Sequence, residues 1–125
     1  MNHLDKKTVL NILLIPFLFF LIMFIVKFIE FYFNISFVKY GVEPQTFSGL
    51  KGIFTSPFIH EDFTHLFNNS YPILILGSML YAFYKKIANQ ILLWLFFITG
   101  FWLWFIGRPA FHIGASGIIY SLAAF

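Results

Sequence analysis

Long apolar runs separated by short polar stretches dominate this sequence. A helix needs about 20 mostly apolar residues to cross the roughly 30 Å of hydrocarbon in a bilayer. The runs predict transmembrane helices over Val9–Val26, reaching to about Ile29, over Phe63–Tyr84, over Ile87–Ile106 and from Ile113 onward. The fourth has reached only Phe125 where the sequence stops, so we expect a fragment cut within a helix.

The first run raises the alternative of a signal peptide, because Lys6 and Lys7 precede it. Its length exceeds the apolar core of about 7–15 residues that is typical of signal peptides, and no A-x-A-like cleavage site follows. The sequence therefore favours a retained first helix.

The composition supports a membrane protein. Sixty per cent of the 125 residues are hydrophobic, 23% are aromatic and 10% are charged, whereas soluble domains average about 45–50% apolar and about 25% charged residues. So small a soluble domain cannot bury this much apolar surface, and a disordered chain would be poor in aromatic residues. With no cysteine, disulfides and thiol nucleophiles are excluded.

The basic residues indicate an orientation in the membrane. The formal net charge is +3, but Lys and Arg occur singly or in pairs between apolar runs, a pattern that argues against nucleic acid as a partner. Lys6 and Lys7 precede the first helix, while Lys85 and Lys86 follow the second. The positive-inside rule then predicts a cytoplasmic N-terminus. The loop over residues 30–62 and the start of the fourth helix would lie on the outer side.

Two polar groups stand near the outer ends of predicted helices. His65 and Asn69 are spaced i, i+4, which puts both side chains on one helix face. Ser116 lies within Gly114-Ala115-Ser116-Gly117, where small neighbours expose its hydroxyl. A serine facing a histidine and an asparagine indicates acyl transfer, with Ser116 as the nucleophile and the other two as oxyanion donors.

Each group also has a structural interpretation. Ser116 and its glycines would equally suit a small-residue seam between helices, and His65 and Asn69 would suit helix capping or interhelical hydrogen bonds. His112 would suit an interfacial site without a catalytic role. A metal site would have to use His60, Glu61, Asp62 and His65, whose spacing matches no standard ligand pattern. We therefore predict no metal and no cofactor.

Two segments resemble the signatures of the rhomboid intramembrane serine proteases. Residues 54–69 (FTSPFIHEDFTHLFNN) resemble the end of that family's first loop and the start of its second helix. Residues 112–120 (HIGASGIIY) resemble its Gly-x-Ser-Gly segment at the start of the fourth helix. The resemblance as a whole covers roughly residues 48–125. The resemblance implies an all-α, polytopic helix bundle, of which about four of six helices are present.

The resemblance also implies roles for single residues. Ser116 matches the nucleophile and Gly114 the glycine that opens the active-site turn. His65 and Asn69 match the side chains that stabilise the oxyanion, beside the backbone N–H of Ser116. Among the supporting positions, His60 matches a structural histidine and Tyr120 matches an aromatic residue that packs on the catalytic histidine.

Two departures from the family pattern limit this interpretation. The family's catalytic histidine lies on the sixth helix, and none of the four histidines here matches it. Lys51-Gly52-Ile53 replaces the Trp-Arg pair that is common in the family's first loop. We therefore expect the 125 residues alone to be inactive.

The function predicted for the complete protein is a multi-pass intramembrane serine endopeptidase. Its substrates would be transmembrane proteins, cleaved in or near their membrane segments within the lipid bilayer. Residues 1–47 would hold the N-terminal tail, the first helix and the start of the outer loop, and residues 48–125 the first part of the peptidase domain. The alternatives are a non-catalytic rhomboid-like protein that binds membrane clients and a small helical channel or transporter subunit.

Overall fold

A computed structural model describes residues 5–125, and every regular element in that range is a helix. The longer helices are α1 (Lys6–Phe33), α3 (Phe63–Phe83), α4 (Ala88–Ile106) and α5 (Ser116–Ala124). Three short elements, η1 (Val38–Tyr40), α2 (Gly49–Thr55) and η2 (Ser56–Phe58), lie between α1 and α3. The all-α prediction is confirmed.

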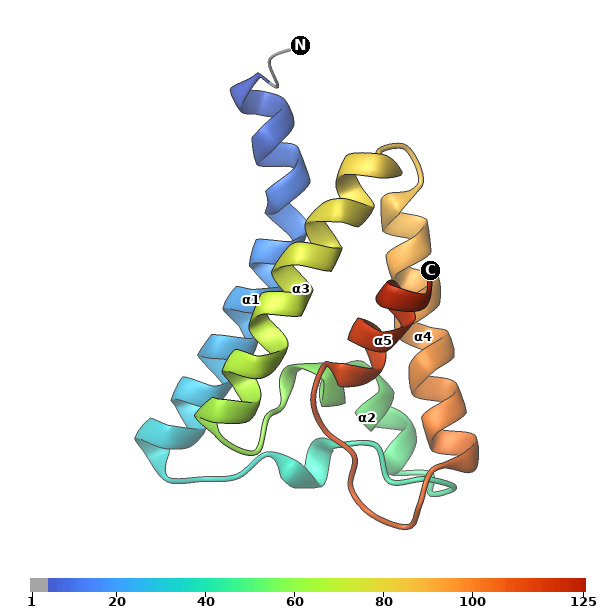
Figure 1. The fold of residues 1–125 in the computed structure, drawn as a ribbon. Coiled ribbons are helices and arrows are strands. Elements are labelled where there is room, and N and C mark those ends of the chain that lie inside the picture. Colours follow the sequence, from blue (N-terminus) through green and yellow to red (C-terminus); the bar gives the residue numbers. More distant parts are fainter. Residues whose placement is uncertain (1–4) are drawn as a thin grey trace.

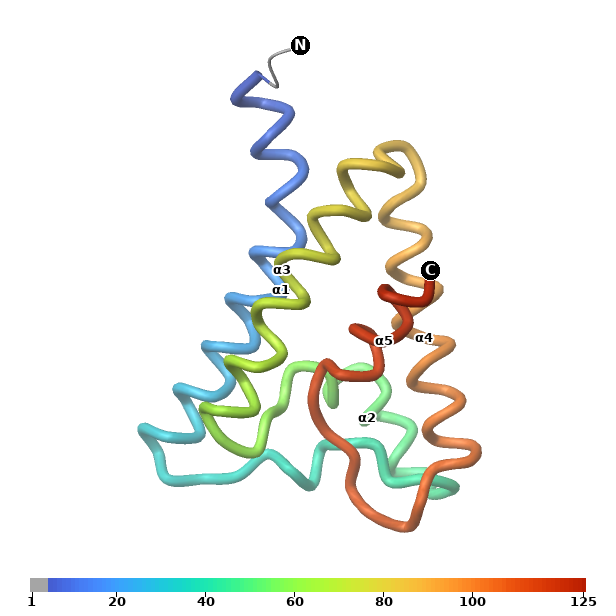
Figure 2. The backbone as a smooth tube through the Cα atoms, in the orientation of Figure 1, coloured from blue at the N-terminus to red at the C-terminus, as the bar shows by residue number. Residues whose placement is uncertain are grey.

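The long helices stand roughly upright and antiparallel in sequence order, as Figure 1 shows. α1 packs along α3, and α5 rises between α3 and α4 and contacts both. The backbone trace places residues 34–62 and 107–115 at one end of the bundle, opposite the turn that joins α3 to α4 (Figure 2). The first turns of α3 and α5 therefore lie toward the same end of the bundle (Figure 2).

The first helix is longer than the sequence predicted. We expected it to end by Ile29 and placed Glu30 in the outer loop, but α1 continues to Phe33 and includes both Lys27 and Glu30. The two side chains are buried, and the Lys27 ammonium lies 4.0 Å from the Glu30 carboxylate. Opposite charges one turn apart offset part of each other's cost of burial, so the helix can extend through them.

Helices approach closely where a glycine faces its neighbour. A Cβ atom on Gly77 of α3 would lie 3.0 Å from Cγ of Pro16 in α1, so the two helices cross at this point. A Cβ atom on Gly117 of α5 would lie 2.7 Å from Cγ2 of Thr99 in α4. Close backbone approach at small residues is typical of helix packing in membranes.

Two of the described helices, α1 and α4, are long and apolar enough to cross a membrane, with mean hydropathies of 3.0 and 1.6. α3 is 21 residues long, but His65, Asn68 and Asn69 make its first turns polar. Many large apolar side chains on α1 and α4 face outward. Such faces suit lipid rather than water.

The loop between α1 and α3 is pinned to the second half of the chain. Val42 and His112 exchange both backbone hydrogen bonds, with N···O distances of 2.9 and 2.8 Å. The Gln45 N–H donates to the Trp104 carbonyl at 2.9 Å, and the Trp104 indole donates to the Thr46 carbonyl at 2.8 Å. These bonds hold the C-terminal end of α4 and the segment before α5 against the loop.

The last helix begins later than predicted. We expected it near Ile113, but α5 starts at Ser116. Gly114 has φ +99°, a left-handed conformation that no helix continues, and its N–H donates to the Ser56 carbonyl at 2.8 Å. The chain therefore stays non-helical up to Ala115 and turns into the helix at the serine.

Candidate active site

The first turn of α3 fixes the direction of His65. Asp62 caps the helix, with its Oδ1 accepting the His65 backbone N–H at 2.7 Å. Asn69 follows one turn later on the same face and is 7% exposed. Both side chains thus project from α3 toward the segment that leads into α5.

His65 and Asn69 converge on Gly114. A Cβ atom on this glycine would lie 2.9 Å from Cε1 and 3.0 Å from Nε2 of the His65 ring. The same atom would lie 3.4 Å from Nδ2 of Asn69. Only glycine fits here, both because of these contacts and because of its positive φ.

The Asn69 amide is a donor without an acceptor. Its Nδ2 is buried and has no hydrogen-bond partner among the described residues. The neighbouring Ser70 hydroxyl, by contrast, donates to the Leu66 carbonyl at 2.6 Å. A buried N–H group without a hydrogen bond costs stability. A bound molecule with an acceptor oxygen at this position would supply the missing hydrogen bond.

The His65 ring offers a second donor. The Glu61 backbone N–H points to Nδ1 at 3.5 Å, the long end of the range for a hydrogen bond. Since Nδ1 accepts, the neutral ring carries its proton on Nε2. Nε2 is the nitrogen that lies against Gly114.

Ser116 is the first residue of α5 and is half-buried. It lines a cavity of about 230 Å³ between α4, α5 and η2. The other residues that line this cavity are Ser56, Pro57, Phe96, Thr99, Gly100, Leu103, His112, Ile113, Gly114, Gly117, Ile118 and Tyr120. The serine hydroxyl therefore stands beside a space that could take part of a substrate.

The structure does not bring a base to Ser116 from within residues 5–125. His112 lines the same cavity, but its Nε2 is paired with the Arg108 carbonyl at 2.9 Å. Among the described side chains, none makes a hydrogen bond to Ser116. Tyr120, one turn further along α5, also lines the cavity and is 75% exposed.

His60 lies in the loop before α3 and is only 1% exposed. Its ring packs edge-to-face on the His65 ring, with centroids 4.9 Å apart. Burial, followed by the electrostatic effect of the nearby His65, lowers the pKa of His60 to about 4. Neither ring nitrogen has a hydrogen-bond partner among the described residues, so His60 is a neutral packing group at pH 7.

His60, Glu61, Asp62 and His65, the only residues that the sequence offered for a metal site, are not arranged to bind one. Within residues 5–125, no group of three or more His, Cys, Asp or Glu side chains is arranged to hold a metal ion. Asp62 instead caps α3, and His60 stacks against His65.

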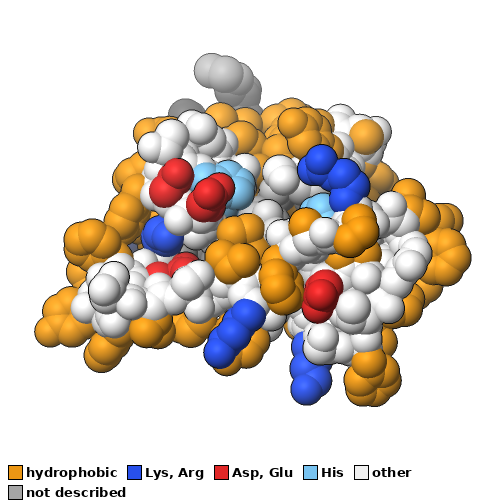
Figure 3. Space-filling model, turned by 90° about the horizontal axis from the view of Figure 1, so that it is seen from below, with side chains coloured by type: hydrophobic (Ala, Val, Ile, Leu, Met, Phe, Trp, Pro, Cys, Tyr) orange, Lys and Arg blue, Asp and Glu red, His pale blue; other side chains and the backbone are white. Residues whose placement is uncertain are grey.

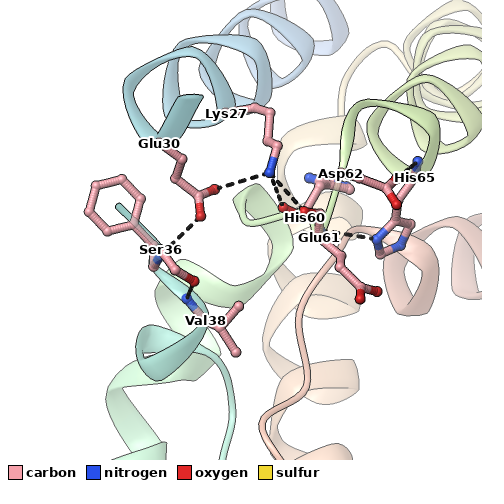
Figure 4. A network of polar contacts seen from close by, with 9 residues as sticks. Lys27, Glu30, Ser36, Val38, His60, Glu61, Asp62 and His65 are labelled. Atoms are coloured by element: carbon pink, nitrogen blue, oxygen red, sulfur yellow. Dashed lines mark hydrogen bonds and ion pairs between the residues drawn. The ribbon is translucent and has the colours of Figure 1, made fainter. Parts of the chain in front are cut away.

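Lys27 and Glu30 lie next to the candidate site, although neither was predicted from the sequence to belong to it. The Lys27 ammonium donates to the carbonyls of His60 and Glu61 at 3.1 and 2.8 Å (Figure 4). The sequence contained a signal for Lys27 and Glu30, because two charged residues spaced i, i+3 follow a long apolar run. Ionisable groups in membrane helices are rare and often functional.

Polar and charged side chains lie at the end of the bundle that carries these residues (Figure 3). Viewed from below, acidic and basic side chains gather there with histidines among them, and hydrophobic side chains surround them (Figure 3).

Similar proteins are found among bacterial sequences. The uncharacterized protein Rv1337 of Mycobacterium tuberculosis is 32% identical over an alignment of 93 residues, which covers 68% of this chain and 38% of that protein. The uncharacterized protein ML1171 of Mycobacterium leprae is 34% identical over an alignment of 84 residues, which covers 61% of this chain and 33% of that protein. This chain thus spans well under half the length of these relatives. No solved structure matches it.

The family resemblance drawn from the two motifs is confirmed. The Rhomboid domain matches residues 48–125, which include the whole of α3, α4 and α5. That family includes both intramembrane proteases and inactive homologues. With most of its length matched to this domain and an all-helical, apolar structure, the chain is a membrane protein that belongs to the rhomboid family.

Proposed function

We propose that the full-length protein is an intramembrane serine endopeptidase that cleaves membrane proteins in or near their transmembrane segments. One observation carries this proposal. The unpaired amide of Asn69 and the Nε2 of His65 both lie against Gly114, two residues before Ser116. Donors without acceptors beside a serine are what an oxyanion hole requires.

Each side chain has a role in acyl transfer. Ser116 Oγ attacks the scissile carbonyl carbon while its proton passes to a general base. The carbonyl oxygen becomes an oxyanion, which Asn69, His65 and the Ser116 backbone N–H stabilise. The amine then leaves with the proton from the base, and water hydrolyses the acyl-serine. No step in this sequence uses a metal or an organic cofactor.

We assign the general base to a part of the protein outside these 125 residues. His112 is paired with Arg108, while His60 and His65 pack on each other. The rhomboid resemblance implies a Ser–His dyad with the histidine on a later helix. Residues 1–125 alone should accordingly be inactive.

We further propose that the site opens to the outer side of the membrane. Lys6 and Lys7 lie at the start of α1, and Lys85 and Lys86 lie in the turn after α3, at the bundle end away from Ser116. The positive-inside rule would make that end cytoplasmic. Residues 48–125 would form the first part of the peptidase domain and residues 1–47 its N-terminal extension.

Labelling of Ser116 by a fluorophosphonate probe tests this function in the full-length protein. We expect labelling and cleavage of a transmembrane substrate, both abolished by Ser116→Ala. Ser121→Ala is the matched control, because Ser121 lies on the same helix with its hydroxyl bonded to the Ile118 carbonyl at 2.7 Å. Full-length protein without labelling or cleavage would instead be a non-catalytic rhomboid-like protein that binds membrane clients.

A further inference from the structure

A buried lysine ties α1 to the loop that precedes α3. Lys27 is 9% exposed, and its Nζ donates to the His60 carbonyl at 3.1 Å and to the Glu61 carbonyl at 2.8 Å (Figure 4). Glu30 supplies an opposite charge 4.0 Å away. Burying an ammonium group costs free energy. The two hydrogen bonds that offset part of this cost both come from one short segment of the loop, residues 60–61.

Both residues that Lys27 holds also contact the ring of His65. The His60 ring packs against it edge-to-face at 4.9 Å between centroids. The Glu61 backbone N–H points to its Nδ1 at 3.5 Å. Lys27 therefore restrains both groups that set the orientation and the tautomer of His65, although it does not itself touch that ring.

We propose that Lys27 is a positioning residue for the His65 donor. By fixing the carbonyls of His60 and Glu61, its ammonium keeps His65 in the tautomer and rotamer that present Nε2–H toward Gly114. Glu30 completes the arrangement as the counter-charge. The catalytic consequence rests on the proposed function, in which His65 stabilises the oxyanion.

The test replaces Lys27 by methionine, which keeps the length of the side chain but removes its charge and donors. Lys51→Met is the matched control, because Lys51 is exposed and its side chain makes no hydrogen bond or ion pair with the other described residues. ¹⁵N NMR of the histidine rings is recorded for the full-length protein in nanodiscs, with His65 assigned by its loss in His65→Gln. Cleavage kinetics are measured on the same samples.

We expect the parent and Lys51→Met to show one His65 species, protonated on Nε2. Lys27→Met should show mixed tautomers, and kcat should fall by up to about 100-fold, the scale of a misplaced group. If Lys27→Met does not fold, Lys27→Gln, whose amide still donates to one carbonyl, provides the same comparison with a smaller shift.

An unchanged His65 spectrum in the folded Lys27 variants would overturn the positioning role. The spectrum answers this question even if the protein cleaves nothing, so the inference and the proposed function fail separately. A shifted spectrum with unchanged kcat would uphold the positioning role while removing His65 from the proposed oxyanion site.

Discussion

The amide nitrogen of Asn69 lies against Gly114, close enough that a Cβ atom on the glycine would stand 3.4 Å from it. The amide is buried and lacks an acceptor among the described residues. It comes from α3, whereas Gly114 belongs to the segment that leads into α5. A donor from α3 is thus held against the segment that leads into α5, two residues before Ser116 in the sequence.

Replacing Asn69 should separate activity from stability. Asn69→Ala should cost about 2.7–4 kcal/mol of transition-state stabilisation if the amide is a main oxyanion donor. Asn69→Leu, which keeps the branched shape and the number of heavy atoms, should leave the free energy of unfolding unchanged or raise it by about 1 kcal/mol, because it removes an unpaired buried donor.

Unfolding in a titration of denaturing detergent and cleavage kinetics measure these two effects. Ser70→Ala is the adjacent control, because its hydroxyl is bonded within α3 and faces no substrate in the proposed mechanism. A large loss of stability in Asn69→Leu, with kcat unchanged, would assign Asn69 to structure alone.

Gly114→Ala should damage both the fold around the site and its activity. The new methyl group would collide with the His65 ring, and the positive φ would add about 1–3 kcal/mol of backbone strain. Gly117→Ala adds the same methyl group in helical backbone, where it meets only the Thr99 side chain. We expect fluorophosphonate labelling to be lost in the first variant and largely kept in the second. Equal labelling of both would mean that Gly114 has no special role.

Acidification should destabilise the protein through His60. Its pKa is about 6.5 in an unfolded chain and about 4 in the folded protein, so between these values only the unfolded state binds the proton. Stability contributed by the neutral ring is complete above pH 6.5. It falls by at most about 1.4 kcal/mol per pH unit as the pH drops toward 4, and is level below that.

His60→Phe isolates this effect because phenylalanine keeps an aromatic ring against His65 without a titrating group. The free energy of unfolding of the parent, minus that of the variant, should decrease from pH 7 to pH 4.5, because only the parent loses stability through His60. A difference that stays constant over this range would show that His60 is not responsible.

Gly52→Ala should be more disruptive than Gly77→Ala. A Cβ atom on Gly52 would overlap the backbone of Gly41, which no side-chain rotation can relieve. At Gly77 the added atom would meet only the ring of Pro16, at 3.0 Å. We expect losses of about 3 kcal/mol and about 1 kcal/mol in the free energy of unfolding. A smaller loss at Gly52 would show that the loop moves to accept the methyl group.

Much of the helical architecture was predictable from local sequence. The apolar runs predicted the long helices, and the structure begins α3 at Phe63 as expected because Asp62 caps it. Two predicted boundaries, the end of α1 and the start of α5, were wrong because contacts with other parts of the chain decide them. α1 continues past Lys27 because the loop before α3 accepts its hydrogen bonds, and α5 starts at Ser116 because Gly114 is held in a non-helical conformation.

By itself, the sequence determined the helical class, the membrane setting, the rhomboid family and the residue types of the candidate site. Those properties depend on hydrophobic length, spacing along one helix and short motifs, all of which are local. Only the tertiary structure decided that His65 and Asn69 meet Gly114 and that Lys27 holds the loop beneath them. These contacts join residues far apart in the chain, and they depend on how α1, α3 and α5 pack, which no local pattern specifies.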